Sequence, residues 1–526
     1  MANDSPGRLV GIDLGTTLSV ISHLDSSGAT VTLPNSEGEP LTRSAIYIDG
    51  NNVVVGNAAK EAAAHYPDKV ATIIKRYMGQ PSFPRNVDGR IFRPETLSAI
   101  ILRKLKEDAE RHIGPISKAV ITVPAYFDDT RRKATEDAGR IAGLDVLDIV
   151  NEPTAAALAH ALQEQLKKDG ATFDLPGGEL TALVYDLGGG TFDVTVVRLA
   201  RNDFETVAID GAVKLGGRDW DEKIVDLVCR EFEAKHGAEL APTEQRREAL
   251  TSLAESTKKL LSKLPSAPIE CSYEDRALRL DLTRSKYEEI TRGLLVQTEF
   301  LTKDVVTKQA QLGWDDIDRV LLVGGSTRMP MVKEMLRRVT GMEPDSSLDP
   351  DQVVAKGAAI FAGITASKTR ETGLMLDEDL QAQLEGITVQ DVTAHSLGVE
   401  TMKHEQLRNA VLIPKNTQLP YATSRVFRTV MSNATQIRVK VLEGEAPNSA
   451  DNMCIGECIV DDLPRNMPAK SPVQVRLSFE KNGRVSVMAL EMTKGGFAHA
   501  EIRNQSGLTE EDIQREAAFV SSLDIQ

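Results

Sequence analysis

The sequence predicts a two-lobed α/β domain followed by an all-β sandwich, and two observations lead to this prediction. Up to about residue 385, strand-like and helix-like stretches alternate, which is typical of βαβ units around a partly parallel sheet. From 392 to about 503, short runs with partial period-two alternation follow one another without a long helix, which indicates a sandwich. We therefore expect four parts: residues 1–385, a linker at 386–391, a sandwich at 392–505, and a short helical tail at 506–526.

In the first half of the α/β part, residues 118–123 are predicted as a strand. A helix follows, with Asp128 or Asp129 as its N-cap and Gly143 near its end. Residues 145–150 (DVLDIV) indicate a buried strand, and the next helix begins at Pro153, a residue suited to a first helical position.

The second half repeats this theme. TALVYDLGGGTFDVTVVRL (181–199) predicts strand, tight turn and strand. RVLLVGGSTRMPMVKEMLRRV (319–339) predicts strand, turn and helix, and LDPDQVVAKGAAIFAGITA (348–366) another helix. The repetition is one of pattern rather than of close identity, and it predicts two similar lobes facing each other across a cleft.

The sandwich and the tail carry clear local signals. Asn482-Gly483 between two strand-like runs suits a type I′ hairpin turn. Thr509, with Asp512 three residues later, predicts the N-terminus of one short helix.

Composition limits the classes of function. At 526 residues, the chain is too long for a single hydrophobic core, so more than one domain is expected. Contents of 41% hydrophobic and 26% charged residues are ordinary for a globular protein. A net charge of −15 argues against direct nucleic-acid binding. The sequence shows no membrane-length apolar run and no signal peptide, and the cysteines form no disulfide framework, so we expect a cytoplasmic protein and no membrane partner. The cysteines are Cys229, Cys271, Cys454 and Cys458.

One type of corner occurs twice, in GIDLGTTLSV (11–20) and VYDLGGGTFDV (184–194). A tight Gly/Thr turn can present backbone N–H groups to an anion, and glycine permits close approach of a phosphate. The Asp that ends each entering strand is a suitable ligand for Mg²⁺ or its waters. A single corner is most often an ordinary turn. Two of them, together with GGST (324–327) before a helix N-terminus, predict a nucleotide phosphate site.

These motifs resemble the DnaK-type heat-shock chaperone family, which shares the actin-like ATPase fold. The resemblance covers about residues 8–505. It rests on the two corners and on KRYMG (75–79), VPAYFDDTRRKATEDAGRIAGL (123–144), IVNEPTAAALA (149–159), KLGGRDWD (214–221), LLVGGSTRMP (321–330) and DVTAHSLGVE (391–400). It implies an actin-like ATPase domain that binds ATP and Mg²⁺, followed by a β-sandwich domain of the peptide-binding type.

The resemblance also implies roles for residues that spacing alone does not identify. Lys75 in isolation would be a surface lysine, and the polar face of the helix around 244–264 would be a solvated face. By resemblance, Lys75, Glu152, Asp186 and Thr191 act in hydrolysis, and Asp13 and Asp186 face Mg²⁺ and its waters. The implied nucleotide-binding residues are Gly15, Thr16, Thr17, Leu18, Gly188, Gly189, Gly190, Gly216, Gly217, Glu255, Lys258, Lys259, Ser262, Gly324, Gly325, Ser326, Arg328 and Asp351.

The sequence departs from the family pattern in several places. Leu18 replaces the usual Tyr, Lys214 and Arg218 replace a His and an acidic residue, and Ala394 replaces the Pro that follows the linker. The linker GITVQD (386–391) has polar Thr388 and Gln390 where the family has leucines, which predicts weakened docking on the ATPase domain. The helical lid and the acidic terminus of the family are also missing from the sequence.

These departures are similar to those of the truncated, atypical members found in the fungal ribosome-associated complex. That similarity implies a stable heterodimer with a J-domain protein of the zuotin type, stimulation of a second, ribosome-bound chaperone that contacts nascent chains, and very slow or absent hydrolysis. An ordinary ATP-hydrolysing chaperone that binds unfolded clients directly is the alternative. A small-molecule kinase on the same fold is disfavoured, because a kinase needs no appended sandwich.

Overall fold

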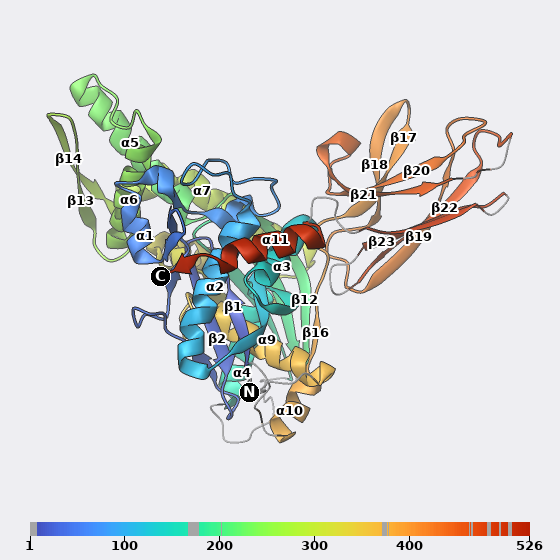
Figure 1. The fold of residues 1–526 in the computed structure, drawn as a ribbon, viewed down its shortest axis with the longest axis horizontal. Helices are drawn as coiled ribbons and strands as arrows, with labels where there is room; N and C mark the ends of the chain where they lie inside the picture. The colour runs from blue at the N-terminus through green and yellow to red at the C-terminus, as the bar shows by residue number, and fades with distance from the viewer. Residues whose placement is uncertain are drawn as a thin grey trace.

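The α/β part forms two lobes, and the sandwich lies to one side of them (Figure 1). The structure is a computed structural model. It describes residues 8–166, 178–200, 202–370, 376, 378–461, 463, 466–480, 485–493, 496–502 and 508–526.

The first lobe, lobe I, is built on a sheet of order β3-β2-β1-β8-β9, with β4 paired to β2. Its strands are β1 (Arg8–Asp13), β2 (Leu18–Leu24), β3 (Thr30–Thr32), β4 (Thr42–Arg43), β8 (Ile116–Val123) and β9 (Asp145–Asn151). Helices α2 (Pro94–Ile113) and α3 (Asp129–Ile141) share its core. As predicted, Asp128 caps α3, because its carboxylate accepts a hydrogen bond from the Arg131 amide at 2.9 Å.

The outer part of lobe I is a small sheet of order β25-β6-β5-β7. It consists of β5 (Ile46–Asp49), β6 (Asn52–Val55), β7 (Val70–Ala71) and β25 (Asp524–Ile525), with α1 (Asn57–Ala62) and the 3₁₀ turns η1 (Pro67–Lys69) and η2 (Ile74–Tyr77) beside it. Strand β25 comes from the far end of the sequence.

The second lobe, lobe II, repeats the pairing of the first. Its sheet has the order β15-β10-β11-β12-β16, in which β10 pairs antiparallel with β11 and parallel with β15, as β1 does with β2 and β8. The strands are β10 (Glu179–Leu187), β11 (Phe192–Ala200), β12 (Asp203–Ala212), β15 (Arg319–Val323) and β16 (Thr388–Gln390). The sequence pattern predicted this repetition.

Helices α4 (Glu152–Leu166) and α9 (Val353–Thr369) pack together between the two main sheets, α4 on β10, β11 and β15 of lobe II and α9 on β1, β2 and β8 of lobe I. Their backbones come so close that a Cβ on Gly357 would lie 1.7 Å from the Ala155 carbonyl oxygen. The outer elements of lobe II are α5 (Gly217–His236), α6 (Glu244–Leu261), β13 (Ser266–Tyr273), β14 (Arg276–Thr283), α7 (Arg284–Asp304), the short π-helix η3 (Val305–Gln309), η4 (Trp314–Asp316), η5 (Gly325–Arg328) and α8 (Pro330–Thr340). Helix α10 (Glu378–Glu385) packs on α9.

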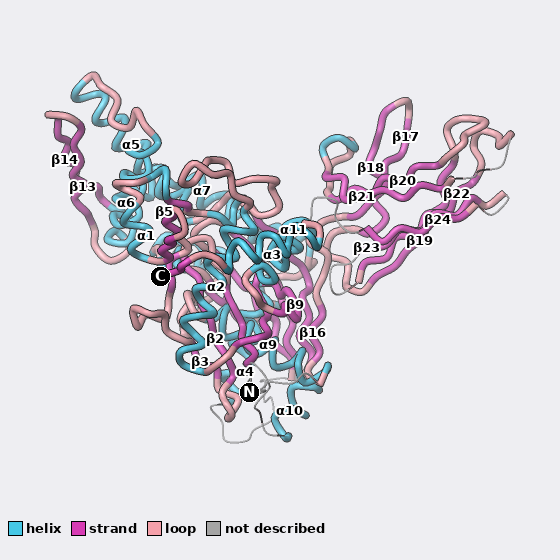
Figure 2. Tube along the Cα trace, in the orientation of Figure 1, coloured by secondary structure: helices cyan, strands magenta, loops and turns pink. Residues whose placement is uncertain are grey.

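The sandwich consists of two four-stranded antiparallel sheets, of order β18-β17-β20-β21 and β19-β22-β23-β24 (Figure 2). The elements are β17 (Leu397–Lys403), β18 (Gln406–Ile413), β19 (Tyr421–Arg428), β20 (Ile437–Glu443), η6 (Ser449–Asp451), β21 (Met453–Val460), β22 (Pro472–Phe479), β23 (Val485–Glu491) and β24 (Phe497–Ile502). The predicted Asn482-Gly483 turn lies outside the described residues, although β22 and β23 on either side of it pair antiparallel. None of the helices in the described ranges is long and apolar enough to cross a membrane.

The linker lies on lobe II, contrary to the expectation of weakened docking. Strand β16 pairs in parallel with β12, and the Lys368 ammonium donates a hydrogen bond to the Ile387 carbonyl. Side chains alternate along a strand, so Ile387 is buried (4% exposed) while Thr388 and Gln390 are exposed. The expectation was wrong because the two polar residues occupy the outward positions, where leucine would add little burial.

The predicted C-terminal helix is present as α11 (Glu510–Ser521), with Thr509 as N-cap and Asp512 completing the capping box. The helix packs on α2 and α3 of lobe I rather than on the sandwich (Figure 1). Sequence analysis predicted the helix but not its position.

Candidate nucleotide site

A cleft of about 670 Å³ lies between the two lobes. That volume is within the usual range for small-molecule sites. Every residue of the predicted site lines the cleft except Gly190 and Gly216, which lie directly behind its wall. The fold thus brings the predicted residues together, and their individual roles stay predictions.

The two Gly/Thr corners meet at the floor of the cleft. One turn joins β1 to β2 and the other joins β10 to β11. A Cβ on Gly189 would lie 2.0 Å from the Thr17 hydroxyl oxygen, and one on Gly190 would lie 2.5 Å from the Thr16 methyl carbon. No side chain fits at either glycine, so the backbone there stays open to a phosphate.

An acidic cluster surrounds one lysine beside these corners. Lys75 is buried and forms an ion pair with the buried Glu152. Burial alone lowers the pKa of Lys75, but Glu152 and Asp13 outweigh this effect and the net shift is upward. Two residues before Lys75, Ile73 has a φ of 51°, a strained value for a β-branched residue, and strain of this kind is typical of functional sites.

The carboxyl groups of Asp13, Asp186 and Asp193 lie near Glu152 and share one lysine, Lys75. Burial, followed by the charge of Glu152, raises the pKa of Asp13 to about 7 and that of Asp193 to about 8. Burial and Glu152 likewise raise the pKa of Asp186 well above its usual range. Burial is the main cause of these shifts and repulsion between the carboxylates adds to it, so a divalent cation bound here would stabilise their charged forms.

The donor set fits magnesium held through its waters. Within the described part of the chain, no three His, Cys, Asp or Glu side chains gather closely enough to hold an ion directly. Mg²⁺ commonly keeps several waters and uses only one or two carboxylates together with phosphate oxygens. Asp13, which also accepts a hydrogen bond from the Thr122 hydroxyl at 3.0 Å, and Asp186 can serve in that way.

The other end of the cleft is polar and well ordered by ion pairs. On α6, Glu255 contacts Arg43 at 2.8 Å and Lys259 at 2.7 Å, and Lys258 contacts Asp221 at 2.8 Å. Ser262, next along this helix face, also lines the cleft. The face that spacing alone would leave in solvent therefore forms a wall of the cleft.

The GGST turn forms the wall opposite α6. The Ser326 hydroxyl donates to the Gly188 carbonyl at 3.0 Å, and Arg328 bridges Asp349 and Asp351 at 2.7 Å each. Gly324 has a φ of 80°, a conformation that favours glycine, and a Cβ there would lie 2.5 Å from the Leu187 carbonyl oxygen.

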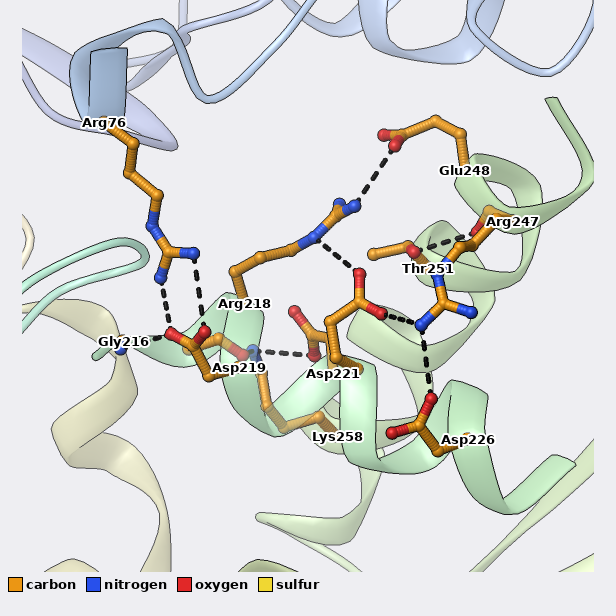
Figure 3. Close-up of polar contacts among 12 residues, drawn as sticks. Arg76, Gly216, Arg218, Asp219, Asp221, Asp226, Arg247, Glu248, Thr251 and Lys258 are labelled. Carbon is orange, nitrogen blue, oxygen red and sulfur yellow. Dashed lines mark hydrogen bonds and ion pairs between the residues drawn. The ribbon is translucent and has the colours of Figure 1, made fainter. Parts of the chain in front are cut away.

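The N-terminus of α5 carries a network that joins the two lobes (Figure 3). Asp219 accepts from the Gly216 amide at 2.8 Å and forms a forked ion pair with Arg76 of lobe I. Arg218, one of the departures from the family pattern, contacts Glu248 at 3.3 Å. It is therefore held within lobe II rather than free to reach across the cleft.

Sequence analysis missed the residues that bridge the lobes. Among the described residues, Arg43 pairs with Glu255, Lys60 with Glu248 at 3.2 Å, and Arg76 with Asp219 across the cleft. Arg76 lies in KRYMG (75–79), Asp219 in KLGGRDWD (214–221) and Asp193 in the second corner, so adjacency to predicted residues was an available signal. Arg43 and Lys60 carried no such signal.

Two α/β lobes of like topology, with paired Gly/Thr corners and acidic side chains at one cleft and a β-sandwich attached, define an ATPase-type domain with a binding module. Comparison with protein families gives the same result: the family model described as Hsp70 protein matches residues 9–522. The chain belongs to the Hsp70 family. Members of this family are chaperones that in general bind ATP with Mg²⁺.

Proposed function

We propose that this protein binds ATP and Mg²⁺ tightly, hydrolyses ATP very slowly or not at all, and works at the ribosome as the permanent partner of a J-domain protein. The proposal that the protein binds ATP and Mg²⁺ rests on the contact between the two Gly/Thr corners beside the Lys75–Glu152 ion pair. Backbone and charge are arranged there for a phosphate chain and its cation.

The roles of this chain's own residues follow from their positions. The Thr16–Thr17 and Gly188–Gly190 corners would hold the phosphates from two sides. Asp13 and Asp186 would orient the waters of the cation, which itself supplies charge neutralisation when bound. Lys75, fixed by Glu152, would stay protonated and face the terminal phosphate. Phosphoryl transfer depends mainly on such positioning and charge stabilisation.

Slow hydrolysis is proposed because of Leu18, which lines the cleft at the start of β2. Where the family has a Tyr hydroxyl, this chain presents only an aliphatic group. A neutral hydrogen bond contributes about 0.5–1.5 kcal/mol, so its absence from the transition state would alone slow the reaction about 2- to 10-fold. Arg218, which lines the cleft where the family has an acidic residue, is proposed to slow it further. Bound but unhydrolysed, ATP at a thousandfold excess over Kd would stabilise the fold by about 4 kcal/mol.

This claim is tested by single-turnover hydrolysis with Leu18→Tyr and, as matched control, Leu18→Phe. We expect the Tyr variant to gain activity and the Phe variant, which adds the ring without the hydroxyl, to gain none. Wild-type turnover at the rate of ordinary chaperones, accelerated by a free J-domain, would support the alternative of an ATP-cycling chaperone that binds unfolded clients itself.

The J-domain partner and ribosome association are proposed from the departures from the family pattern, chiefly the polar linker residues Thr388 and Gln390. We expect a segment of the partner to pack on the sandwich. The test is purification of the tagged full chain from cytoplasmic extract, with quantification of what co-purifies. A J-domain protein in a one-to-one ratio, together with ribosomes, is the expected result. Recovery of the chain alone, or with many unfolded clients, would contradict it.

A further inference from the structure

Residues 508–526, here called the strap, follow the sandwich in the sequence and lie across lobe I. Within the strap, α11 crosses α2 and α3, and β25 continues to the outer sheet of that lobe (Figure 1). Ile513, Val520 and Leu523 are 5%, 0% and 4% exposed and belong to the same apolar core as α2 and α3. The strap thus completes the core of a domain that precedes it by almost 400 residues.

Polar contacts fix the position of the helix. Arg140 of α3 makes a forked ion pair with Glu510 at 2.7 and 2.8 Å. The Thr96 hydroxyl of α2 donates to Glu516 at 2.8 Å, and the Arg103 guanidinium donates to the Val520 carbonyl.

Backbone pairing fixes the strand that follows. The Asp524 amide donates to the Asn51 carbonyl at 3.0 Å, and the Gln526 amide donates to the Val53 carbonyl at 2.8 Å. The Val55 amide donates in return to the Gln526 carbonyl at 3.0 Å. Main-chain hydrogen bonds between an added strand and a sheet edge give both binding affinity and a fixed register, so the strap has one defined position on lobe I.

The sandwich is therefore held at both of its chain ends. Strand β16 precedes the sandwich in the chain and extends the sheet of lobe II at β12. The strap follows the sandwich in the chain and extends the small sheet of lobe I at β6. A second attachment raises the effective concentration of the sandwich at its docking surface.

The docking surface combines a small apolar cluster of Ala125, Ile209 and Val392 with several polar contacts. Asn416 accepts from the Ile209 amide at 3.0 Å, and Lys415 contacts Asp210 at 2.9 Å. Glu443 is buried facing His395, Asp128 and Asp129, and its Oε2 has no hydrogen-bond partner among the described residues. Such an interface favours relative domain motion unless another element restrains it.

We propose that the strap is a latch that keeps the sandwich docked on the ATPase lobes whether or not nucleotide is bound. The apolar burial and strand pairing of the strap are independent of the cleft, so the docked arrangement does not require ATP. This deepens the proposed function: a sandwich in a constant position offers a permanent partner the same surface at all times.

The test is hydrogen–deuterium exchange of the linker peptide 386–391 in the full chain, stripped of nucleotide with EDTA and then resupplied with Mg²⁺ and ATP. The Thr388 amide, which donates to the Asn202 carbonyl at 2.7 Å, reports docking directly. We compare Val520→Asp, which buries a carboxylate under the strap, with Ala518→Asp on the exposed face of the same helix.

Wild type and Ala518→Asp are expected to exchange slowly at the linker with and without ATP. Val520→Asp, and a chain ending at residue 507, are expected to exchange on the order of tenfold faster or more once nucleotide is removed. A wild-type linker that loses protection on removal of ATP, or a Val520→Asp linker as protected as wild type, overturns the latch. Because the nucleotide-free arm needs no ATP binding, failure of the latch and failure of the proposed ATP site are told apart.

Discussion

Substitution of Gly189 by alanine tests whether the contact between the two corners forms the nucleotide site. An added Cβ would lie 2.0 Å from the Thr17 hydroxyl oxygen and 3.0 Å from the Thr17 Cβ, well inside normal contact distance. The corners must then move apart. Overpacking of this kind costs about 1–3 kcal/mol. If that cost falls on the bound geometry, ATP affinity weakens about 5- to 150-fold.

Titration calorimetry with ATP and Mg²⁺ measures this loss. Gly293→Ala is the matched control, because Gly293 is exposed on α7 and a Cβ there meets no atom within 4 Å. In a Thr17→Ala background, the clash with the hydroxyl is gone, so the same glycine substitution should cost less. Wild-type affinity in Gly189→Ala, with a folded protein, would refute this account of the site.

Three further predictions concern the lobes and the docked sandwich. Arg43→Ala removes the 2.8 Å pair with Glu255 across the cleft and should speed nucleotide release about 2- to 5-fold in stopped-flow assays; an unchanged rate would show that the pair does not restrain opening. Burial raises the pKa of Glu443 from 4.5 to about 8, so the contribution of its protonated form to docking is complete below 4.5 and is lost as pH rises through 8. The protection factor of the linker amides, which corrects for the base-catalysed rise of intrinsic exchange with pH, should therefore fall from pH 6 to 9 in wild type and stay constant in Glu443→Gln. Ile387→Asn should undock the linker while the neighbouring Thr388→Asn leaves it docked, as the same exchange experiment would show.

The corners and the face of α6 could be predicted because their signals are local. Each Asp comes at the end of an apolar strand, and each glycine run follows at once, so the turn and its chemistry are present in about ten residues. The side of α6 that carries Glu255 and Lys258 was visible as a polar face. What it faces was not visible, since a solvated face and a cleft wall have the same periodicity.

The remaining features depend on contacts between distant parts of the chain. Lys60 and Glu248 are 188 positions apart, and nothing near either residue indicates the other. The capping box at Thr509 predicts where α11 begins, but its apolar stripe does not say that the partner is lobe I. The linker prediction was wrong for a different reason: it weighed residue types without applying strand alternation, which places Thr388 outside and Ile387 inside.

The positions of the two sheet additions bear on how nucleotide and sandwich communicate. A linker docked only on lobe II would let the sandwich report the state of the cleft, because it would follow that lobe as the cleft opens. Here the strap attaches the same sandwich to lobe I as well. Relative motion of the lobes must then strain either the strap or the docking surface around Lys415 and Asn416. The arrangement therefore opposes cleft opening and release of the sandwich together, which suits a protein that retains its nucleotide and keeps one partner rather than one that cycles between clients.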